Sequence, residues 1–277
     1  MTAAATSPGA LPRALRAAPL RHAEHVMGTV FSFTVRDAGL GARRVGVEAA
    51  LRRAVARLHG IDRVFSPYWR DSQVSRLARA ESTLADCDPE LAEVLERCRE
   101  VARETDGWFT AYPGGRLDPS GWVKGWAVEE AVRILREAGA ADFSVGGGGD
   151  VQCVGGPWRV GVAHPARPGA LVAVVAGHDL AVATSGTAER GPHILDPHTG
   201  RPATGLLSLT LVGRRLARTD AWATAAFAMG PDRGPAWVEA RAGVEALAVL
   251  PDGRRRWTSG FPALVAPGVP LGRSGRD

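Results

Sequence analysis

The spacing of apolar and polar positions changes about halfway along this chain. In the first half, apolar residues recur at helical spacing over Val45–Leu58 and Glu90–Glu104, after an alternating stretch over His25–Val35 that predicts a strand. Further helices are predicted over Trp126–Glu137, Asp220–Met229 and Val238–Arg241. Further strands are predicted over Phe143–Val145, Val151–Val154, Trp158–Val162, Leu171–Val175, Ala181–Thr184, Leu207–Val212 and Val244–Leu250. Helices first and strands later indicate an α+β fold rather than a doubly wound parallel sheet.

Capping residues mark two helix starts. Asp71-Ser72 and Asp88-Pro89 each precede a run with apolar residues at helical spacing. Ser and Asp side chains accept hydrogen bonds from N–H groups of the first helical turn, and proline suits the first helical position because its φ is fixed. We therefore expect helices to begin directly after both pairs.

The chain is long enough to bury a sizeable core, with 277 residues and 45% hydrophobic side chains. It has no internal repeat and no long linker. We therefore expect one domain over residues 22–266, between a disordered arm over residues 1–21 and a mobile tail over residues 267–277.

Compartment signals favour the cytoplasm. No apolar run approaches the ~20 residues of a membrane-spanning helix, and Met1–Pro19 lacks the apolar core of a signal peptide. The three cysteines, Cys87, Cys98 and Cys153, are odd in number and lack metal-site spacing, so we expect buried, unreactive thiols in a reducing compartment. We expect no membrane anchor, and the sequence leaves both a monomer and a homodimer open.

The charged residues are distributed unusually in one respect. Lys and Arg total 34 against 29 Asp and Glu, but the arginines are scattered among acids, which does not favour nucleic-acid binding. Lys124 is the only lysine, so this position stands out against the arginine-rich background.

Two glycine-containing segments carry candidate chemistry in the middle of the chain. In Leu117–Trp126, Asp118, Gly121 and Lys124 are spaced three apart, so a helical turn would present them on one face to a ligand with hydrogen-bond donors and phosphates. The alternative is a plain helix start with a surface lysine. The glycine run in Ser144–Asp150 either frees amides to bind an anion or simply forms a tight loop.

Two later segments add a candidate base and a candidate metal site. Thr184-Ser185-Gly186 is followed by His193, whose imidazole suits a base near neutral pH, although a lone histidine is usually structural or exposed. Asp220 and Thr224 are four residues apart on a predicted helix, and their oxygens suit Mg²⁺ or Ca²⁺. The alternative here is a helix-capping Asp and an ordinary helical Thr.

Taken together, the order and spacing of these segments resemble the ApbE family of flavin transferases. The matching segments are His25–Thr29, Phe65–Tyr68 with Asp71-Ser72, Asp118–Gly125, Gly148–Asp150, Thr184–Gly186, His193–Pro202 and Asp220–Thr224. The resemblance covers residues from about 22 to 250. Each motif alone is unspecific, but His-x-x-Asp-Pro-x-Thr-Gly-x-Pro followed by Asp-Ala-x-Ala-Thr is hard to obtain by chance.

The resemblance implies an enzyme that takes FAD, releases AMP and joins FMN through a phosphoester to a threonine of an acceptor flavoprotein. It implies a T-fold-like α+β scaffold with a mainly antiparallel sheet core and flanking helices, His193 as catalytic base, and Mg²⁺ held by Asp220, Thr224 and the Gly121 carbonyl. The residues that it places against FAD are Met27, Tyr68, Trp108, Phe109, Thr110, Asp118, Lys124, Gly148, Gly149, Asp150, Thr184, Ser185 and Ile194.

Three positions depart from the family's pattern. Thr110 stands where the family commonly has Asp, Gly146 where it commonly has Asn, and Ala223 where some members have a further metal-ligating carboxylate. Two alternatives therefore stay open: an Mg²⁺-dependent FAD pyrophosphatase that releases FMN and AMP, and a non-catalytic FAD-binding protein. A base at His193 and metal ligands in the later motif favour catalysis.

Overall fold

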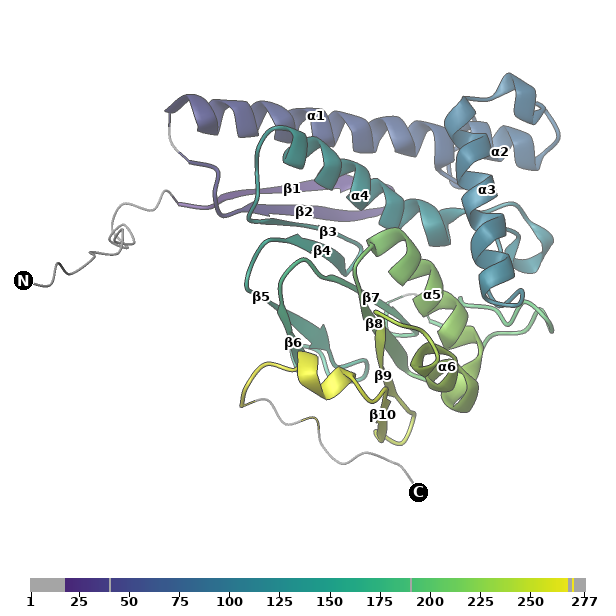
Figure 1. Cartoon of the computed structure of the whole chain (residues 1–277). Coiled ribbons are helices and arrows are strands. Elements are labelled where there is room, and N and C mark those ends of the chain that lie inside the picture. The colour runs from purple at the N-terminus through teal and green to yellow at the C-terminus, as the bar shows by residue number, and fades with distance from the viewer. Residues whose placement is uncertain (1–17, 40, 190, 269–270, 272–277) are drawn as a thin grey trace, which may run out of the picture.

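Helices pack on a large antiparallel sheet in the residues that the computed structural model describes, 18–39, 41–189, 191–268 and 271 (Figure 1). Within these residues, the sheet contains, in order of neighbours, β1 (Leu20–Val26), β2 (Thr29–Val35), β3 (Phe143–Gly147), β4 (Asp150–Val154), β7 (Ala181–Gly186), β8 (Ser208–Gly213), β9 (Glu245–Val249) and β10 (Arg255–Trp257). A separate hairpin pairs β5 (Trp158–Ala163) with β6 (Leu171–Gly177). The helices are α1 (Gly41–Phe65), α2 (Gln73–Ala78), α3 (Pro89–Glu104), α4 (Ser120–Glu137), α5 (Leu216–Ala228) and α6 (Gly230–Glu239), with short 3₁₀ turns η2 (Leu84–Asp86), η3 (Pro113–Gly115) and η4 (Phe261–Leu264). This arrangement confirms the predicted α+β class.

Both faces of the central strands are covered. On one face, α4 packs against α1 and α5, and α5 lies on β7 and β8 (Figure 1). The core there includes Phe31, Phe33, Phe143, Leu211 and Phe227. On the other face, the hairpin and η4 bury Trp158, Val172, Val182, Val212 and Phe261. Every residue of β8 is buried as a result. The centre of the sheet is therefore packed on both faces and holds the loops at its ends in place.

The helix starts marked by capping residues are confirmed. The Ser72 hydroxyl accepts a hydrogen bond from Ser75 N ahead of α2, and the Asp88 carboxylate accepts one from Glu90 N at the start of α3. The local capping signals therefore fixed both boundaries.

The single strand predicted over residues 25–35 is wrong, because the chain reverses inside it. Met27 and Gly28 have φ angles of 57° and 69° and form the turn between β1 and β2. Two successive residues with positive φ are typical of the tight turn that joins twisted antiparallel strands. The alternation of apolar and polar residues continues through this turn, so the pattern concealed it.

Several other predicted boundaries are also wrong. The last helix was predicted over residues 238–241, but α6 begins at Gly230, and Pro231 and Pro235 within it hid its periodicity. α4 begins at Ser120 rather than at Trp126, and β10 was not predicted. β1 begins at Leu20, inside the segment predicted as an arm; residues 1–17 and most of the predicted tail lie outside the described residues.

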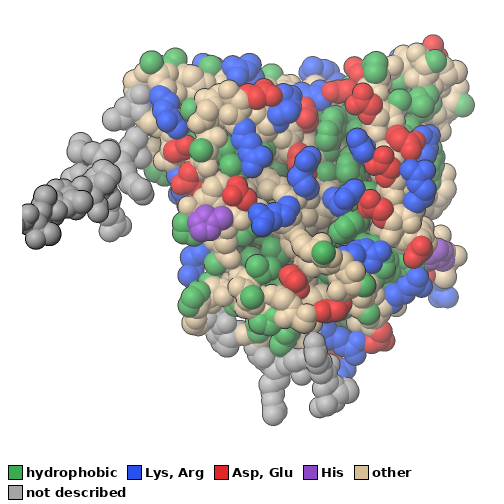
Figure 2. Space-filling view, viewed as in Figure 1, with side chains coloured by type: hydrophobic (Ala, Val, Ile, Leu, Met, Phe, Trp, Pro, Cys, Tyr) green, Lys and Arg blue, Asp and Glu red, His purple; other side chains and the backbone are tan. Residues whose placement is uncertain are grey.

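Charges of both signs are mixed on the face of the molecule seen in Figure 2. Ion pairs of the described residues include those of Arg133, which lies 3.1 Å from Glu130 and 2.8 Å from Glu137. No helix in the described ranges combines the length and the hydropathy needed to span a bilayer. Cys98 and Cys153 are buried, and burial raises the pKa of each thiol to about 12, whereas Cys87 is only half-buried.

Candidate active site

A cavity of about 550 Å³ opens where the first turns of α4, the side of α5 and the ends of β4 and β7 meet. This volume is in the usual range for small-molecule sites. Every site residue predicted from the sequence lines it: Met27, Tyr68, Trp108, Phe109, Thr110, Asp118, Gly121, Lys124, Gly148, Gly149, Asp150, Thr184, Ser185, His193, Ile194, Asp220 and Thr224. The fold thus brings together segments that are up to 197 positions apart, from residue 27 to residue 224. The chemical roles of these residues stay predictions.

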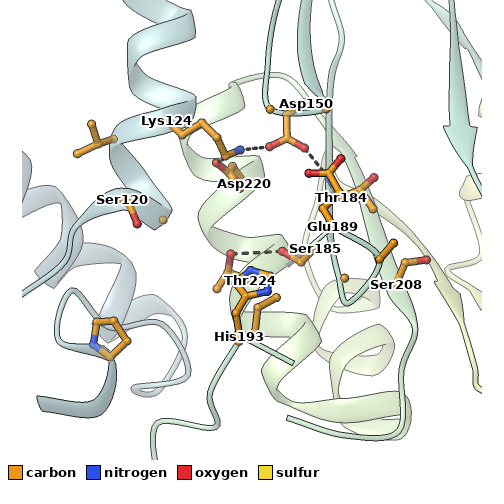
Figure 3. A pocket seen from close by; sticks show the side chains of 18 of the residues that line it. Ser120, Lys124, Asp150, Thr184, Ser185, Glu189, His193, Ser208, Asp220 and Thr224 are labelled. Atoms are coloured by element: carbon orange, nitrogen blue, oxygen red, sulfur yellow. Dashed lines mark hydrogen bonds and ion pairs between the residues drawn. The ribbon is translucent and has the colours of Figure 1, made fainter. Parts of the chain in front are cut away.

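Lys124 forms the charged centre of the cavity. Its ammonium reaches from α4 to ion-pair with the Asp150 carboxylate and with Asp220 Oδ2, the latter at 2.8 Å (Figure 3). Asp150 is itself oriented by Thr184 N, which donates to its Oδ1 at 2.8 Å. Burial lowers the pKa of Lys124, but the two carboxylates outweigh burial and raise it above its usual value. The lysine is therefore a fixed positive charge, not a surface side chain.

Burial and the neighbouring lysine have opposite effects on the pKa of Asp220. Burial raises its pKa to about 7, although Lys124 acts to lower it. Apart from the Lys124 ammonium at 2.8 Å, no described residue donates a hydrogen bond to its Oδ2. A carboxylate oxygen has more than one lone pair, so Oδ2 can coordinate a metal cation as well as accept from the ammonium. The alternative of a helix-capping Asp220 is wrong, because α5 begins four residues earlier at Leu216.

Oxygen atoms suited to a hard cation gather beside Asp220. The Thr224 hydroxyl follows one turn later on α5 and lies 3.3 Å from the Ser185 hydroxyl of β7 (Figure 3). Gly121 lies in the first turn of α4 and lines the same cavity, whereas Ala223 is fully buried and supplies no ligand. The described residues contain no group of three or more His, Cys, Asp or Glu that could hold a metal. One carboxylate with hydroxyl and carbonyl oxygens fits Mg²⁺, which keeps several waters and needs few carboxylates.

Asp118 and the glycine turn frame the lysine from two sides. Asp118 lies just before α4, where its Oδ1 accepts a hydrogen bond from Ser120 N at 3.0 Å. Of the three residues predicted to share one helical face, only Gly121 and Lys124 therefore lie within the helix. Gly148 and Gly149, with φ angles of 59° and 89°, turn the chain between β3 and β4. A Cβ on Gly148 would lie 3.1 Å from Lys124 Cδ. The glycine run therefore forms a tight hairpin turn that also leaves room for the lysine; a role in anion binding stays a prediction.

His193 is exposed on the loop between β7 and β8. Its Nδ1 lies 3.0 Å from the Gly191 carbonyl, which can only accept a hydrogen bond. Nδ1 therefore carries the proton of the neutral ring, and Nε2 keeps a free lone pair. This arrangement prepares the side chain to accept a proton in the cavity.

Aromatic side chains form another part of the lining. Phe109 is buried, and Tyr68 is 79% exposed and lines the cavity. Trp108 packs edge-to-face on His198, with ring centroids 4.6 Å apart. Rings of this kind suit a planar heterocyclic ligand.

Two acidic residues of the lining were missed from the sequence. Asp62 of α1 is 5% exposed, and the described residues give its carboxylate no hydrogen bond or ion pair. An acid between the apolar residues Ile61 and Phe65 on a helix was the signal that could have found it. Glu189, on the loop before His193, also lines the cavity, and no local pattern singles it out.

The fold and the cavity define an α+β protein with a polar ligand site built from loops and helix ends. The ApbE family profile matches residues 27–114 and 110–248, and the chain belongs to the ApbE family. It is 34% identical to an FAD:protein FMN transferase of Rhodobacter capsulatus over 204 residues, which are 66% of this chain and 39% of that protein. It is 32% identical to an FAD:protein FMN transferase of Vibrio cholerae over 139 residues, 45% of this chain and 42% of that protein. The chain thus spans less than half the length of these curated relatives.

Solved structures share the fold. The ApbE protein of Thermotoga maritima superposes with a TM-score of 0.76 at 23% identity, covering 90% of this chain and 99% of that one. The flavin transferase ApbE of Vibrio cholerae superposes with a TM-score of 0.74 at 21% identity, covering 89% and 99%. At this level of identity the likeness establishes the architecture.

Proposed function

We propose that this chain is an Mg²⁺-dependent FAD:protein FMN transferase. The observation that carries the proposal is the convergence of Lys124, His193, Asp220 and Thr224 on one cavity. Family membership and the names of the curated relatives support it. In the reaction, the threonine oxygen of the acceptor bonds to the phosphorus that carries riboflavin. The bond from that phosphorus to the bridging oxygen breaks, and AMP leaves with that oxygen.

The charge of the cavity supports a metal-dependent reaction. Five carboxylates line it, those of Asp62, Asp118, Asp150, Glu189 and Asp220, against the single ammonium of Lys124. A pyrophosphate is repelled by such a surface unless a cation binds with it. Mg²⁺ would be held by Asp220, Thr224 and the Gly121 carbonyl. When bound, it neutralises the negative charge that develops on the leaving phosphate.

The chain's own residues divide the remaining tasks. His193 Nε2 accepts the proton of the threonine hydroxyl, which is a poor nucleophile at neutral pH. Lys124 supplies a fixed positive charge beside the dinucleotide. Asp118 accepts hydrogen bonds from the adenine end, and Met27, Tyr68, Trp108 and Ile194 contact the flavin. The remaining predicted contacts are those of Phe109, Thr110, Gly148, Gly149, Asp150, Thr184 and Ser185.

Incubation with FAD, Mg²⁺ and threonine-bearing candidate acceptors tests the proposal. We expect a fluorescent acceptor band and one AMP per flavin attached, measured by mass spectrometry. His193→Ala is expected to bind FAD normally and to lose transfer. Binding of FAD without labelling of any acceptor would contradict transfer, and rapid release of FMN that added acceptor does not slow would identify hydrolysis instead.

A further inference from the structure

The outer edge of β5 has no pairing partner among the described residues. β5 pairs with β6 alone, and the opposite side of β6 is covered near the C-terminus, where Ala266 N donates to Val174 O at 2.8 Å. The N–H and C=O groups of a strand residue point to one side, and those of the next residue point to the other. Since Val174 points away from β5, Val175 points toward it.

The register then fixes which groups of β5 are free. Val175 is opposite Val160, so the backbone of Val160 faces β6. His164 N donates to Ala170 O at 2.8 Å. The backbone of His164, four residues after Val160, therefore also points to the side of β6, as the alternation requires. By alternation, Arg159, Gly161 and Ala163 direct their N–H and C=O groups outward, and no hydrogen bond from a described residue reaches those groups.

This free edge forms part of the cavity wall. Four consecutive residues of β5, from Val160 to Ala163, line the cavity, and so do His164 and Pro165 directly after it. Successive side chains of a strand point to opposite faces, so one face could contribute only alternate residues. Residues of both faces line the cavity, and Gly161 can do so only with its backbone, which indicates that the edge of β5 faces the cavity. β5 contains neither proline nor lysine, the residues that commonly protect an exposed edge.

We propose that an extended segment of the acceptor protein adds to β5 as a further strand and so carries its threonine into the cavity. This proposal rests on the proposed function. Main-chain hydrogen bonds to the outward groups of β5 supply the affinity, and alternate side chains of the segment supply specificity. Arg159 is exposed at one end of the edge, and Arg167, also exposed, lies close enough to His164 at the other end to act on its charge. Acidic side chains flanking the threonine fit these positive ends.

Ala163→Pro tests the enzyme side. It removes one outward N–H, leaves pairing with β6 intact and adds little bulk, because proline is tolerated where an edge N–H faces outward. We expect kcat/KM for the acceptor to fall about tenfold or more through KM, which is about 1.4 kcal/mol. FAD affinity, measured by quenching of flavin fluorescence, should stay within about twofold.

The matched control is Ala23→Pro, on the exposed outer strand β1. The two-residue turn places the Val26–Thr29 pair in mutual hydrogen bonding, so Ala23 directs its N–H away from β2, and Ala23 does not line the cavity. This variant should transfer flavin like the unsubstituted protein. Unchanged acceptor KM in Ala163→Pro, or an equal loss of FAD affinity, would overturn the proposal.

A scan of the acceptor provides a second measurement that does not depend on folding of the enzyme variant. Single proline substitutions at successive residues on both sides of the labelled threonine are expected to reduce transfer at every second position. Uniform tolerance or sensitivity without this period would overturn strand addition. Failure of the proposed function is distinguishable, because the unsubstituted enzyme would then label no acceptor.

Discussion

The single lysine, in a chain with 33 arginines, occupies a position of the cavity where two carboxylates converge. Its unbranched stem passes over Gly148, and its compact ammonium reaches both Asp150 and Asp220. Arginine carries a planar fork of donors that needs more space and different angles. The composition alone showed only that lysine is rare here; the geometry supplies a physical reason for keeping it.

Lys124→Arg is therefore expected to be costly. We expect kcat/KM for FAD to fall about tenfold or more and stability to fall by about 1–3 kcal/mol because of overpacking. Steady-state kinetics and urea unfolding measure the two effects. Arg133→Lys, at an exposed surface ion pair, is the control and should change stability by less than about 0.5 kcal/mol. Equal behaviour of the two variants would contradict a site role for the lysine.

The raised pKa of Asp220 predicts how stability varies with pH in the metal-free protein. The carboxyl has a pKa near 3.8 when unfolded and about 7 when folded. Between these values the folded state holds a proton that the unfolded state has lost, so this group lowers stability progressively as the pH rises from about 4 to about 7. Asp220→Asn removes this contribution.

Relative to the unsubstituted protein, the Asn variant should gain stability as the pH rises from about 4 to about 8, because its side chain does not titrate. Urea unfolding in EDTA across this pH range measures the difference. Two curves that stay parallel at every pH would show that Asp220 is not the group that titrates.

At the scale of elements, the site depends on how closely α4 and α5 approach each other. Gly125 of α4 sits directly on α5: a Cβ there would lie 2.8 Å from both Ala217 Cα and Leu216 O. These are backbone atoms, which cannot move without shifting the helix. Because α4 carries Lys124 and α5 carries Asp220, this contact also sets the separation of the two charges.

Gly125→Ala is expected to push the helices apart. We predict a loss of about 1–3 kcal/mol in unfolding free energy and weaker metal and FAD binding. Gly46→Ala in α1 has open space around its Cβ and should instead stabilise by up to about 1 kcal/mol. Thermal unfolding and FAD titration of both variants test this, and a Gly125→Ala protein as stable as the control would refute the close contact.

Elements were predictable where the local pattern agreed with the tertiary structure. The capping Ser72 and Asp88 and the periodic α3 were readable because their signals are local. The β1–β2 turn and α6 were not, because the apolar alternation continues across Met27 and because glycine and proline mask the helical period. The same limit applies to the site: Asp118 and Asp220 stand in motifs, whereas Asp62 joins the cavity only through the packing of α1.

At the scale of the whole molecule, segments that are distant in the sequence form a cavity whose charged lining is mostly acidic. Its five carboxylates face one ammonium, so without a bound cation the cavity repels an anionic group such as the pyrophosphate of the proposed substrate. Under the proposed function, the isoalloxazine ring, which carries no such charge, would contact the aromatic part of the lining. The metal is therefore expected to control binding of the phosphates and not binding of the ring.

Removal of divalent metal with EDTA should accordingly weaken FAD binding by about tenfold or more, equivalent to about 1.4 kcal/mol. Riboflavin, which has the same ring without phosphate, is the matched ligand and should bind equally well with and without Mg²⁺. Isothermal titration at constant ionic strength measures both affinities and separates specific metal binding from general screening. Asp220→Asn should weaken FAD binding in Mg²⁺ to the level reached in EDTA, because it removes the carboxylate that we propose to hold the cation. FAD affinity in EDTA equal to that in Mg²⁺ would contradict a cation that holds the phosphates against these carboxylates.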